Sequence, residues 1–486
     1  MDNNQGKIKS QVISGLFWKF SERMGVQLVN FAISIVLARL LAPGDYGLIA
    51  LVSIFITISN IFITNGFGNA IIQKSSVDET DLSSVFFFSS ATSIILFIVL
   101  FFSAPLISDF YNTPALTIII RVMGIQLIIA GINSVQISYV MRNMMFKRFF
   151  FSTLSGTILS AAVSLVMAYG GFGVWALVAQ TLVSNFVNMV VLWFTSKWRP
   201  KLVFSWQRMK GMYSYSWKLL VSSLVDTTYN ELRSLVIGKI YSPADLAYFT
   251  KGRQFPNLIT TNVNTTIDSV LFPAIAKEQG DPSRVKIMMR RSIKTSAYIM
   301  IPLMSGLAVV AKPLVLLLLT DKWSACIPYL QISCFTGVLM PIQTANLQAI
   351  KAVGRSDITL KTEIIKKVFG LLLLFTVMRQ GVLLIALSGI ITASAFSFIN
   401  AFPNARLLNY KYFEQMVDIL PYVLLSAVMC LFVWPVQYLN LSNFLTLAIQ
   451  VSLGGAVYLL LSWIFKIDSL LYIMDVLKQF LSKQKA

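Results

Sequence analysis

Long apolar runs, separated by short polar connections, make up most of the 486-residue chain. A run of about 20 residues crosses a hydrocarbon layer of roughly 30 Å as a helix, because an α-helix rises about 1.5 Å per residue. The runs lack the alternation of apolar and polar residues that membrane β-strands show. The pattern therefore predicts an all-α polytopic membrane protein with about fourteen spans. They cover residues 12–38, 46–67, 82–107, 115–140, 150–169, 173–195, 213–238, 246–275, 291–319, 325–350, 357–378, 381–404, 416–437 and 443–465.

The connection between the first two predicted spans has a counterpart roughly 200 positions later. Residues 38–48 and 239–248 share a basic residue, a proline and an aspartate in the same register. The aligned pairs are Arg39 with Lys239, Pro43 with Pro243, and Asp45 with Asp245. A long internal period indicates a repeated architecture. We expect the proline and the aspartate to set each turn rather than to touch a substrate.

The repeat predicts two lobes that run the same way through the membrane, because each half has an even number of spans. We expect residues 1–210 to form an N-terminal lobe of six helices with a cytoplasmic linker. Residues 211–408 would form a C-terminal lobe of six helices. Residues 409–486 would add two helices and a cytoplasmic tail.

The composition agrees with a membrane protein, and the location of the basic residues explains the high net charge. Hydrophobic residues make up 56% of the chain and charged residues 12%. The net charge of +20 would suit nucleic acid if the basic residues formed one patch. They fall instead in alternate connections, the pattern of cytoplasmic loops. We therefore expect no nucleic-acid partner, no cleaved signal peptide, a plasma-membrane protein and cytoplasmic termini.

Polar residues within four of the spans follow helical faces. An ionisable residue at mid-bilayer costs at least roughly 2.5–3.5 kcal/mol, so it is expected to face a water-filled cavity or a partner. In span 246–275 the polar face is made by Thr250, Gln254, Asn257, Thr261, Asn264 and Asp268. Shorter faces are made by Lys19, Arg23, Gln27, Asn30 and Ser34, by Thr57, Asn60 and Thr64, and by Ser223, Asp226, Asn230 and Arg233.

We expect these four helices to line a hydrophilic cavity. The alternative is that their charges neutralise one another, Glu22 with Arg23, and Asp226 or Glu231 with Arg233. The basic residues of these spans outnumber the local acids, which predicts an anionic substrate, because arginine forks match phosphate oxygens. The predicted cationic set is Arg23, Arg39, Arg233, Lys239, Lys251 and Arg253.

Catalytic signatures are missing from the sequence. The chain has no histidine, and its three cysteines show no metal-ligand spacing. The phosphate-binding loop of ATPases does not occur. We expect a protein that is not an enzyme and that uses neither a cofactor nor a metal.

Residues 12–73 carry a resemblance to a known family. The stretches 15–19, 38–48 and 66–73 resemble the start of the polysaccharide transporter branch of the multidrug/oligosaccharidyl-lipid/polysaccharide flippase superfamily. These stretches resemble Wzx-type flippases, especially those of exopolysaccharide clusters such as colanic acid or teichuronic acid. The number of spans, the basic loops and the repeat extend the resemblance loosely to the whole chain.

The resemblance implies a MATE-like fold and a function. Such proteins move an undecaprenyl-pyrophosphate-linked oligosaccharide from the inner to the outer leaflet of the bacterial plasma membrane, by alternating access through a cationic central cavity. It implies that Arg23, Arg233 and Arg253 attract the pyrophosphate, and that spans 13 and 14 guide the lipid tail. The residues it suggests for the sugar are Asn30, Gln254, Asn257, Thr261 and Asn264.

The superfamily also suggests coupling to protons or sodium, which without histidine would use Glu22, Asp226, Glu231 or Asp268. Expected partners are membrane lipid, a polysaccharide polymerase and glycosyltransferases. One alternative is a drug or cation antiporter of the same superfamily, which predicts an acid-dominated cavity. Another is a membrane glycosyl polymerase or ligase, which usually carries a large external loop with catalytic arginine or histidine. A lipid II or sporulation-type flippase differs only in the sugar that it carries.

Overall fold

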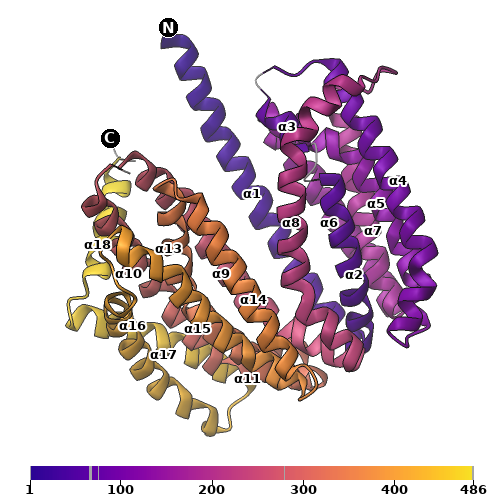
Figure 1. Ribbon diagram of the computed structural model, residues 1–486. Helices are drawn as coiled ribbons and strands as arrows, with labels where there is room; N and C mark the ends of the chain where they lie inside the picture. The colour runs from indigo at the N-terminus through magenta and orange to yellow at the C-terminus, as the bar shows by residue number, and fades with distance from the viewer. Residues whose placement is uncertain (1, 65–67, 75, 279, 484–486) are drawn as a thin grey trace. The chain divides into compact units, whose positions relative to one another are not determined.

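The computed structural model describes residues 2–64, 68–74, 76–278 and 280–483, and helices make up nearly all of them (Figure 1). No strand occurs within these ranges. The predicted all-α class is confirmed.

The helices follow the predicted spans. Those of the first half are α1 (Asp2–Leu40), α2 (Pro43–Thr64), α4 (Glu79–Phe110), α5 (Ala115–Arg142), α6 (Phe146–Tyr169) and α7 (Val174–Thr195). Those of the second half are α8 (Trp206–Ile240), α9 (Pro243–Lys277), α10 (Pro282–Val309), α11 (Ala311–Leu319), α12 (Ile327–Val338), α13 (Met340–Ala352), α14 (Ser356–Val377), α15 (Val382–Leu407), α16 (Tyr412–Val433) and α17 (Asn443–Ile464). The shorter elements are α3 (Gly68–Gln73), α18 (Asp468–Lys483) and the 3-10 helices η1 (Asp321–Cys326) and η2 (Trp434–Leu439).

Ten described helices are long and apolar enough to span a membrane, or eleven if the bent pair Asp321–Val338 and Met340–Ala352 counts as one span. The remaining predicted spans are α8, α9 and α14, in which polar residues interrupt the apolar run. The protein is therefore a multi-pass membrane protein, and about fourteen helices agree with its fold.

Two predicted spans are not single straight helices. The span predicted at 291–319 is divided between α10 and α11 near Pro313, which has no backbone N–H to continue the ladder. The span predicted at 325–350 bends by 40° where α12 meets α13, just before Pro341. Proline explains both departures from the predicted straight spans.

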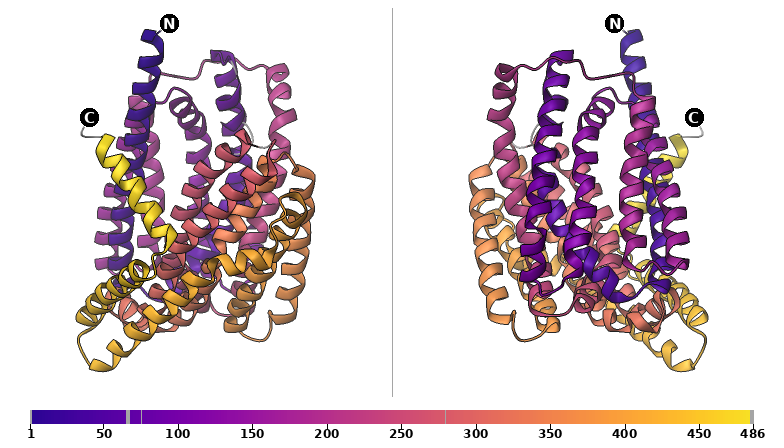
Figure 2. Two further views of the ribbon diagram at one scale, coloured as in Figure 1. Left: turned by 90° about the vertical axis from the view of Figure 1, so that its left-hand side faces the viewer. Right: turned by 90° about the vertical axis from the view of Figure 1, so that its right-hand side faces the viewer.

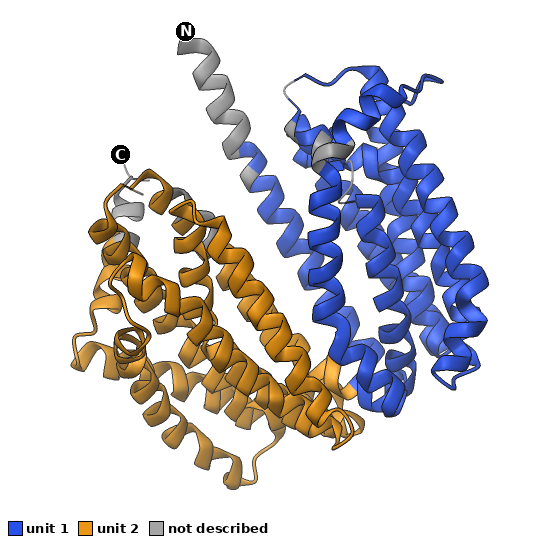
Figure 3. Cartoon of the chain, viewed as in Figure 1, with its two compact units in different colours: residues 1–247 blue, residues 248–486 orange. Residues whose placement is uncertain are grey.

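The chain forms two compact units, residues 1–247 and 248–486 (Figure 3). Helix α8 belongs to the first unit because it packs against α2 and α4. The division into lobes at residues 210 and 408 stays a prediction. Within unit 1, α4 packs on α5, α6 packs on α7, and α1 packs on α6. Long helices make up most of this unit (Figure 2).

Small residues allow the close packing of α6 on α7. Buried positions recur at steps of four along α6, at Ser152, Gly156, Ser160, Ser164 and Ala168. A Cβ at Gly156 would lie 2.7 Å from the carbonyl oxygen of Ser184 on α7. Such stripes let membrane helices approach closely, where lipid gives no hydrophobic driving force for association.

The two repeated connections use the same turn chemistry. Asp45 Oδ2 accepts a hydrogen bond from the Ala42 amide at 3.2 Å. Asp245 Oδ2 accepts from the Ser242 amide at 3.1 Å and from the Ser242 hydroxyl at 2.6 Å. The prediction that these aspartates set the turns is confirmed. The connections also meet inside unit 1, where Gly47 lies directly against the backbone of Pro243.

Unit 2 is built around α10, which packs against α12, α13 and α16. Its apolar core is joined by buried amides. The side chain of Asn346 on α13 donates to Gln415 on α16 at 2.7 Å, and Asn404 on α15 donates to Asn346 at 2.8 Å. Each amide thereby gains a partner that hydrocarbon cannot supply, so the network ties three helices together.

We expect Gly156→Leu to lower the melting temperature of the purified protein, because the added side chain meets backbone that cannot move aside. Overpacking typically costs about 1–3 kcal/mol. Gly455→Leu on α17 is the matched control, because a Cβ there meets nothing within 4 Å. Equal melting temperatures for the two variants, measured in detergent by intrinsic fluorescence, would contradict the assigned α6–α7 contact.

Candidate functional site

Helix α9 presents opposite faces of different character. Asn257 and Thr261 are exposed, and Gln254 and Asn264 are half-buried. The opposite side is pressed into unit 2, where a Cβ at Gly252 would lie 2.7 Å from a backbone oxygen. The amide of Asn264 also accepts a hydrogen bond from Thr344 on α13 at 3.2 Å. The side chain of Asp268 lies outside the described residues.

The two predicted cations of α9 do not share one environment. Lys251 is only 6% exposed, and its ammonium lies 5.7 Å from the centre of the Trp323 ring. Arg253 is half-buried, with its guanidinium 5.2 Å from the Phe249 ring. Lys251 therefore lies on the packed side of the helix, away from Asn257 and Thr261.

Helix α1 carries a different ion pair from the one considered. Glu22 pairs with Lys19 at 2.9 Å, and the two are three residues apart on one helical face. Arg23 is exposed and has no carboxylate partner among the described residues. Asn30 is exposed on the same helix. Glu22 thus pairs with Lys19 rather than with Arg23 in the described part of the chain.

Helix α8 bears Asp226 and Asn230 at exposed positions and Glu231 and Arg233 at half-buried ones. Asp226 and Arg233, on this face, both take part in interactions within the protein. Its polar face thus combines both signs of charge.

Lys239, at the end of α8, has a structural contact. Its ammonium donates to the carbonyl oxygen of Phe110 and lies 4.2 Å from the centre of that ring. Phe110 ends α4, where free carbonyls and the helix dipole favour a cation. Lys239 therefore caps a neighbouring helix, whereas Arg39 is exposed at the end of α1.

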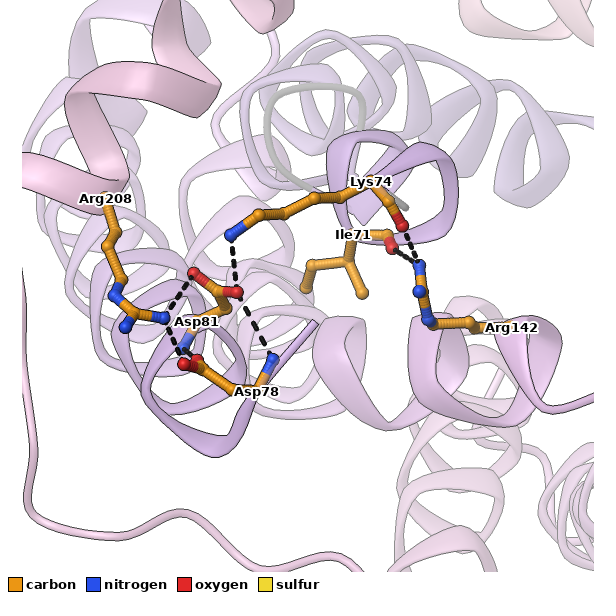
Figure 4. Close-up of polar contacts among 6 residues, drawn as sticks. All are labelled: Ile71, Lys74, Asp78, Asp81, Arg142 and Arg208. Atoms are coloured by element: carbon orange, nitrogen blue, oxygen red, sulfur yellow. Dashed lines mark hydrogen bonds and ion pairs between the residues drawn. The ribbon is translucent and has the colours of Figure 1, made fainter. Parts of the chain in front are cut away.

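A cluster that the sequence reasoning did not single out lies where α4 begins (Figure 4). Asp81 is 1% exposed and pairs with Lys74 at 2.6 Å and with Arg208 at 3.3 Å. Arg208 also pairs with Asp78, the N-cap of α4. The start of α8 is thereby held to the start of α4.

The backbone reinforces this cluster. Asp78 and Asp81 form a reciprocal capping box, each carboxylate accepting from the other's amide. The Asp81 amide, and then Arg208, lower the pKa of Asp78 below its ordinary value. A lowered pKa means that this stabilisation is complete at neutral pH and is lost as the pH falls through the lowered value. The spacing of Asp78 and Asp81 before an apolar run was a readable signal for the cap.

Arg142, at the end of α5, completes the same region. Its guanidinium donates to the carbonyl oxygens of Ile71 and Lys74, each at 2.6 Å. These carbonyls lie at the C-terminal end of α3, where helix carbonyls lack partners. Arg142 thus fixes a short helix.

The chemistry available on these faces is binding. Arginine, lysine, amide and hydroxyl groups can hold phosphate and sugar oxygens through hydrogen bonds. Within the described part of the chain, no three acid or thiol side chains come together as a metal site requires.

The amino-acid sequence is similar to those of bacterial proteins of polysaccharide biosynthesis and transport. The teichuronic acid biosynthesis protein TuaB of Bacillus subtilis (strain 168) is 24% identical over 469 residues, which cover 93% of this chain and 95% of that protein. The succinoglycan biosynthesis transport protein ExoT of Rhizobium meliloti (strain 1021) is 23% identical, with 70% and 69% covered. The lipopolysaccharide biosynthesis protein WzxC of Escherichia coli (strain K12) is 22% identical, with 74% and 73% covered.

Solved structures share the fold. The lipid II flippase MurJ, in an inward closed conformation, matches with a TM-score of 0.72 and 16% identity, covering 93% of this chain and 99% of that one. An inward-facing multidrug resistance transporter of the MATE family matches with a TM-score of 0.61 and 16% identity, covering 79% and 96%. The predicted MATE-like fold and the resemblance based on residues 12–73 are confirmed. Residues 36–328, more than half of the chain, match the family described as "Polysaccharide biosynthesis protein", and the chain belongs to that family.

Proposed function

We propose that this protein is a flippase that carries a polyprenyl-pyrophosphate-linked oligosaccharide from the inner to the outer leaflet. The observation that carries the proposal is the exposed polar face of α9, in a segment set among membrane-spanning helices. Asn257 and Thr261 have exposed side chains on this face. Hydrocarbon would leave them without partners, so water or a polar cargo must meet them.

The cargo would be anionic where it meets the arginines. Arg23 on α1, Arg233 on α8 and Arg253 on α9 are the proposed pyrophosphate ligands. Arg23 is exposed and Arg233 and Arg253 are half-buried, whereas Lys251 is buried and Lys239 caps α4. Bidentate forks suit phosphate better than point charges do. The sugar would be held by Asn30, Gln254, Asn257, Thr261 and Asn264.

The lipid tail would follow the two C-terminal helices. Helix α16 exposes large apolar side chains along its length, among them Phe413, Leu424 and Leu431. A polyprenyl chain can lie against such a surface while the polar head moves through the protein by alternating access. We propose a bacterial inner-membrane location with both termini cytoplasmic, supply of cargo by glycosyltransferases, and delivery to a polysaccharide polymerase.

The alternatives fit less well. A drug or cation antiporter would need acids to dominate the polar faces, but Glu22 is buried in an ion pair and exposed Arg23 lacks a carboxylate partner among the described residues. A glycosyl polymerase or ligase would make bonds, whereas the family resemblance is to proteins of transport. The proposed activity moves a finished intermediate and forms no covalent bond.

Deleting the gene is expected to make a lipid-linked oligosaccharide accumulate in the inner leaflet, because synthesis continues while translocation stops. Extracted lipids and leaflet-specific labelling measure this directly. An unchanged lipid pool together with lost drug resistance would support the antiporter instead.

Replacing both Arg233 and Arg253 with alanine is expected to lower export at least about tenfold, since each loss removes charge-assisted hydrogen bonds to the pyrophosphate. Surface polysaccharide is measured in the deletion strain, with matched amounts of each variant. Arg379→Ala is the control, because Arg379 is an exposed arginine outside the polar faces. Normal export by the double variant would show that the pyrophosphate binds elsewhere.

Reversing the Arg208–Asp78 pair tests whether the cluster at the start of α4 supports transport. Arg208→Asp is expected to lower the melting temperature and export, because three carboxylates would then lie together. Adding Asp78→Arg should recover part of both losses, and only part, because the N-cap is lost. A double variant no better than the single one argues against the pair.

Asp226→Asn is expected to remove the dependence of transport on a proton or sodium gradient, because the exposed carboxylate is the proposed coupling group among Glu22, Asp226, Glu231 and Asp268. The readout is flipping in proteoliposomes with and without each gradient. Asp357→Asn serves as control, since Asp357 is paired with Arg355 at 2.9 Å at the start of α14. Gradient dependence that persists in Asp226→Asn would move coupling to another group.

A further inference from the structure

Unit 2 contains a cavity of about 640 Å³ between α9, α10 and α18. Its walls are largely apolar, with Ile267 and Leu271 from α9 and Met288 and Ile299 from α10. Its volume lies in the range of cavities that hold small organic ligands. The cavity contains none of the residues assigned above to the pyrophosphate or the sugar.

One cation at this cavity differs from its neighbours. Helix α10 carries five basic residues, and four of them pair with carboxylates. These are Arg284 with Glu278 and Asp281, Lys286 with Glu414, and Arg290 and Lys294 with Asp418. The fifth, Arg291, lines the cavity, is exposed, and has no carboxylate partner among the described residues. Its positive charge is left for a ligand.

Helix α18 places an aromatic ring beside this arginine. The Arg291 guanidinium lies 3.6 Å from the centre of the Tyr472 ring. Stacking occupies the face of a guanidinium and leaves its N–H edge free for oxygen acceptors. Helix α18 is itself tied to α16 by a hydrogen bond of 2.8 Å between Ser469 and Tyr422. This bond ties α18 to unit 2 three residues before Tyr472.

We propose that this cavity binds one anionic phospholipid of the surrounding membrane, with its phosphate on Arg291 and one acyl chain along the apolar walls. The hydroxyls of Ser292 and Thr295 line the cavity near Arg291 and can donate to phosphate oxygens. The arginine lies toward the end of α10 that is predicted to face the cytoplasm. That is where the headgroup of an inner-leaflet lipid lies.

The lining favours a phospholipid over the oligosaccharide cargo. Around Arg291 the cavity wall has serine and threonine hydroxyls and the Tyr472 ring. The amide side chain in the lining belongs to Asn262, in the middle of α9. A sugar chain would leave many hydroxyls without partners against these walls. One cation and a few hydrogen-bond donors are enough to bind a phosphodiester headgroup. The inference is independent of the proposed function, because it concerns binding and requires no transport.

The test measures lipid binding to the purified, delipidated full chain by native mass spectrometry. Phosphatidylglycerol is compared with phosphatidylcholine of the same acyl chains. Arg291→Ala is expected to weaken phosphatidylglycerol binding about tenfold, the effect of losing one charge-assisted phosphate contact. Arg284→Ala removes the same charge from the same helix outside the cavity, and it should bind like the wild type. Ala274→Phe fills the cavity without changing charge, and it should weaken binding of both lipids.

Three results would overturn the proposal. Equal losses in Arg291→Ala and Arg284→Ala would mean general attraction of lipid to a basic surface. Unchanged binding in both Arg291→Ala and Ala274→Phe would mean that the lipid lies elsewhere. Arg291-dependent binding of undecaprenyl phosphate, with no such binding of phosphatidylglycerol, would assign the cavity to the transported lipid.

Discussion

A polar group inside a hydrocarbon layer needs a partner or water, and this constraint organises the molecule. The amides of Asn346, Asn404 and Gln415 satisfy it by bonding to one another across three helices. Just before the predicted span 82–107, the buried acid Asp81 likewise has partners, two cations and a backbone amide. After such groups are accounted for, the exposed polar side chains of α9 stand out. They are the side chains that the proposed transport path uses.

Basic residues in this chain serve several physical purposes, and position along the sequence does not separate them. Arg142 and Lys239 donate to carbonyls at the ends of short or neighbouring helices. Arg290 and Lys294 share Asp418 within unit 2. Arg23 and Arg291 have no carboxylate partner among the described residues. The net charge of +20 therefore combines residues that cap helices and residues that form ion pairs with residues proposed to bind ligands.

The apolar runs were enough to predict the spans, and the repeated proline and aspartate were enough to predict the turn chemistry, because both depend on residues close in sequence. The bend before Pro341 and the break near Pro313 also have local causes, and proline spacing would have indicated them. The ion pair of Glu22 was predictable in kind, because residues three apart share a helical face and adjacent residues do not. Lys251 shows the limit of the pattern. It follows Thr250 directly, so it points around the helix toward Trp323, a contact that only the tertiary structure reveals. Arg208 and Asp78 are likewise 130 residues apart in sequence, and no spacing rule brings them together.

The serine hydroxyls of α6 donate to carbonyls of their own helix, Ser152 to Phe149, Ser160 to Thr157 and Ser164 to Ala161. The helix therefore meets α7 with a surface that is small and already satisfied. Such a segment can leave the translocation machinery and enter the bilayer before α7 has been synthesised, because these three hydroxyls already donate hydrogen bonds within their own helix. The pairing of the two helices then depends mainly on shape, with one added contact in which the Asn188 amide of α7 donates to the Ser152 hydroxyl at 3.5 Å.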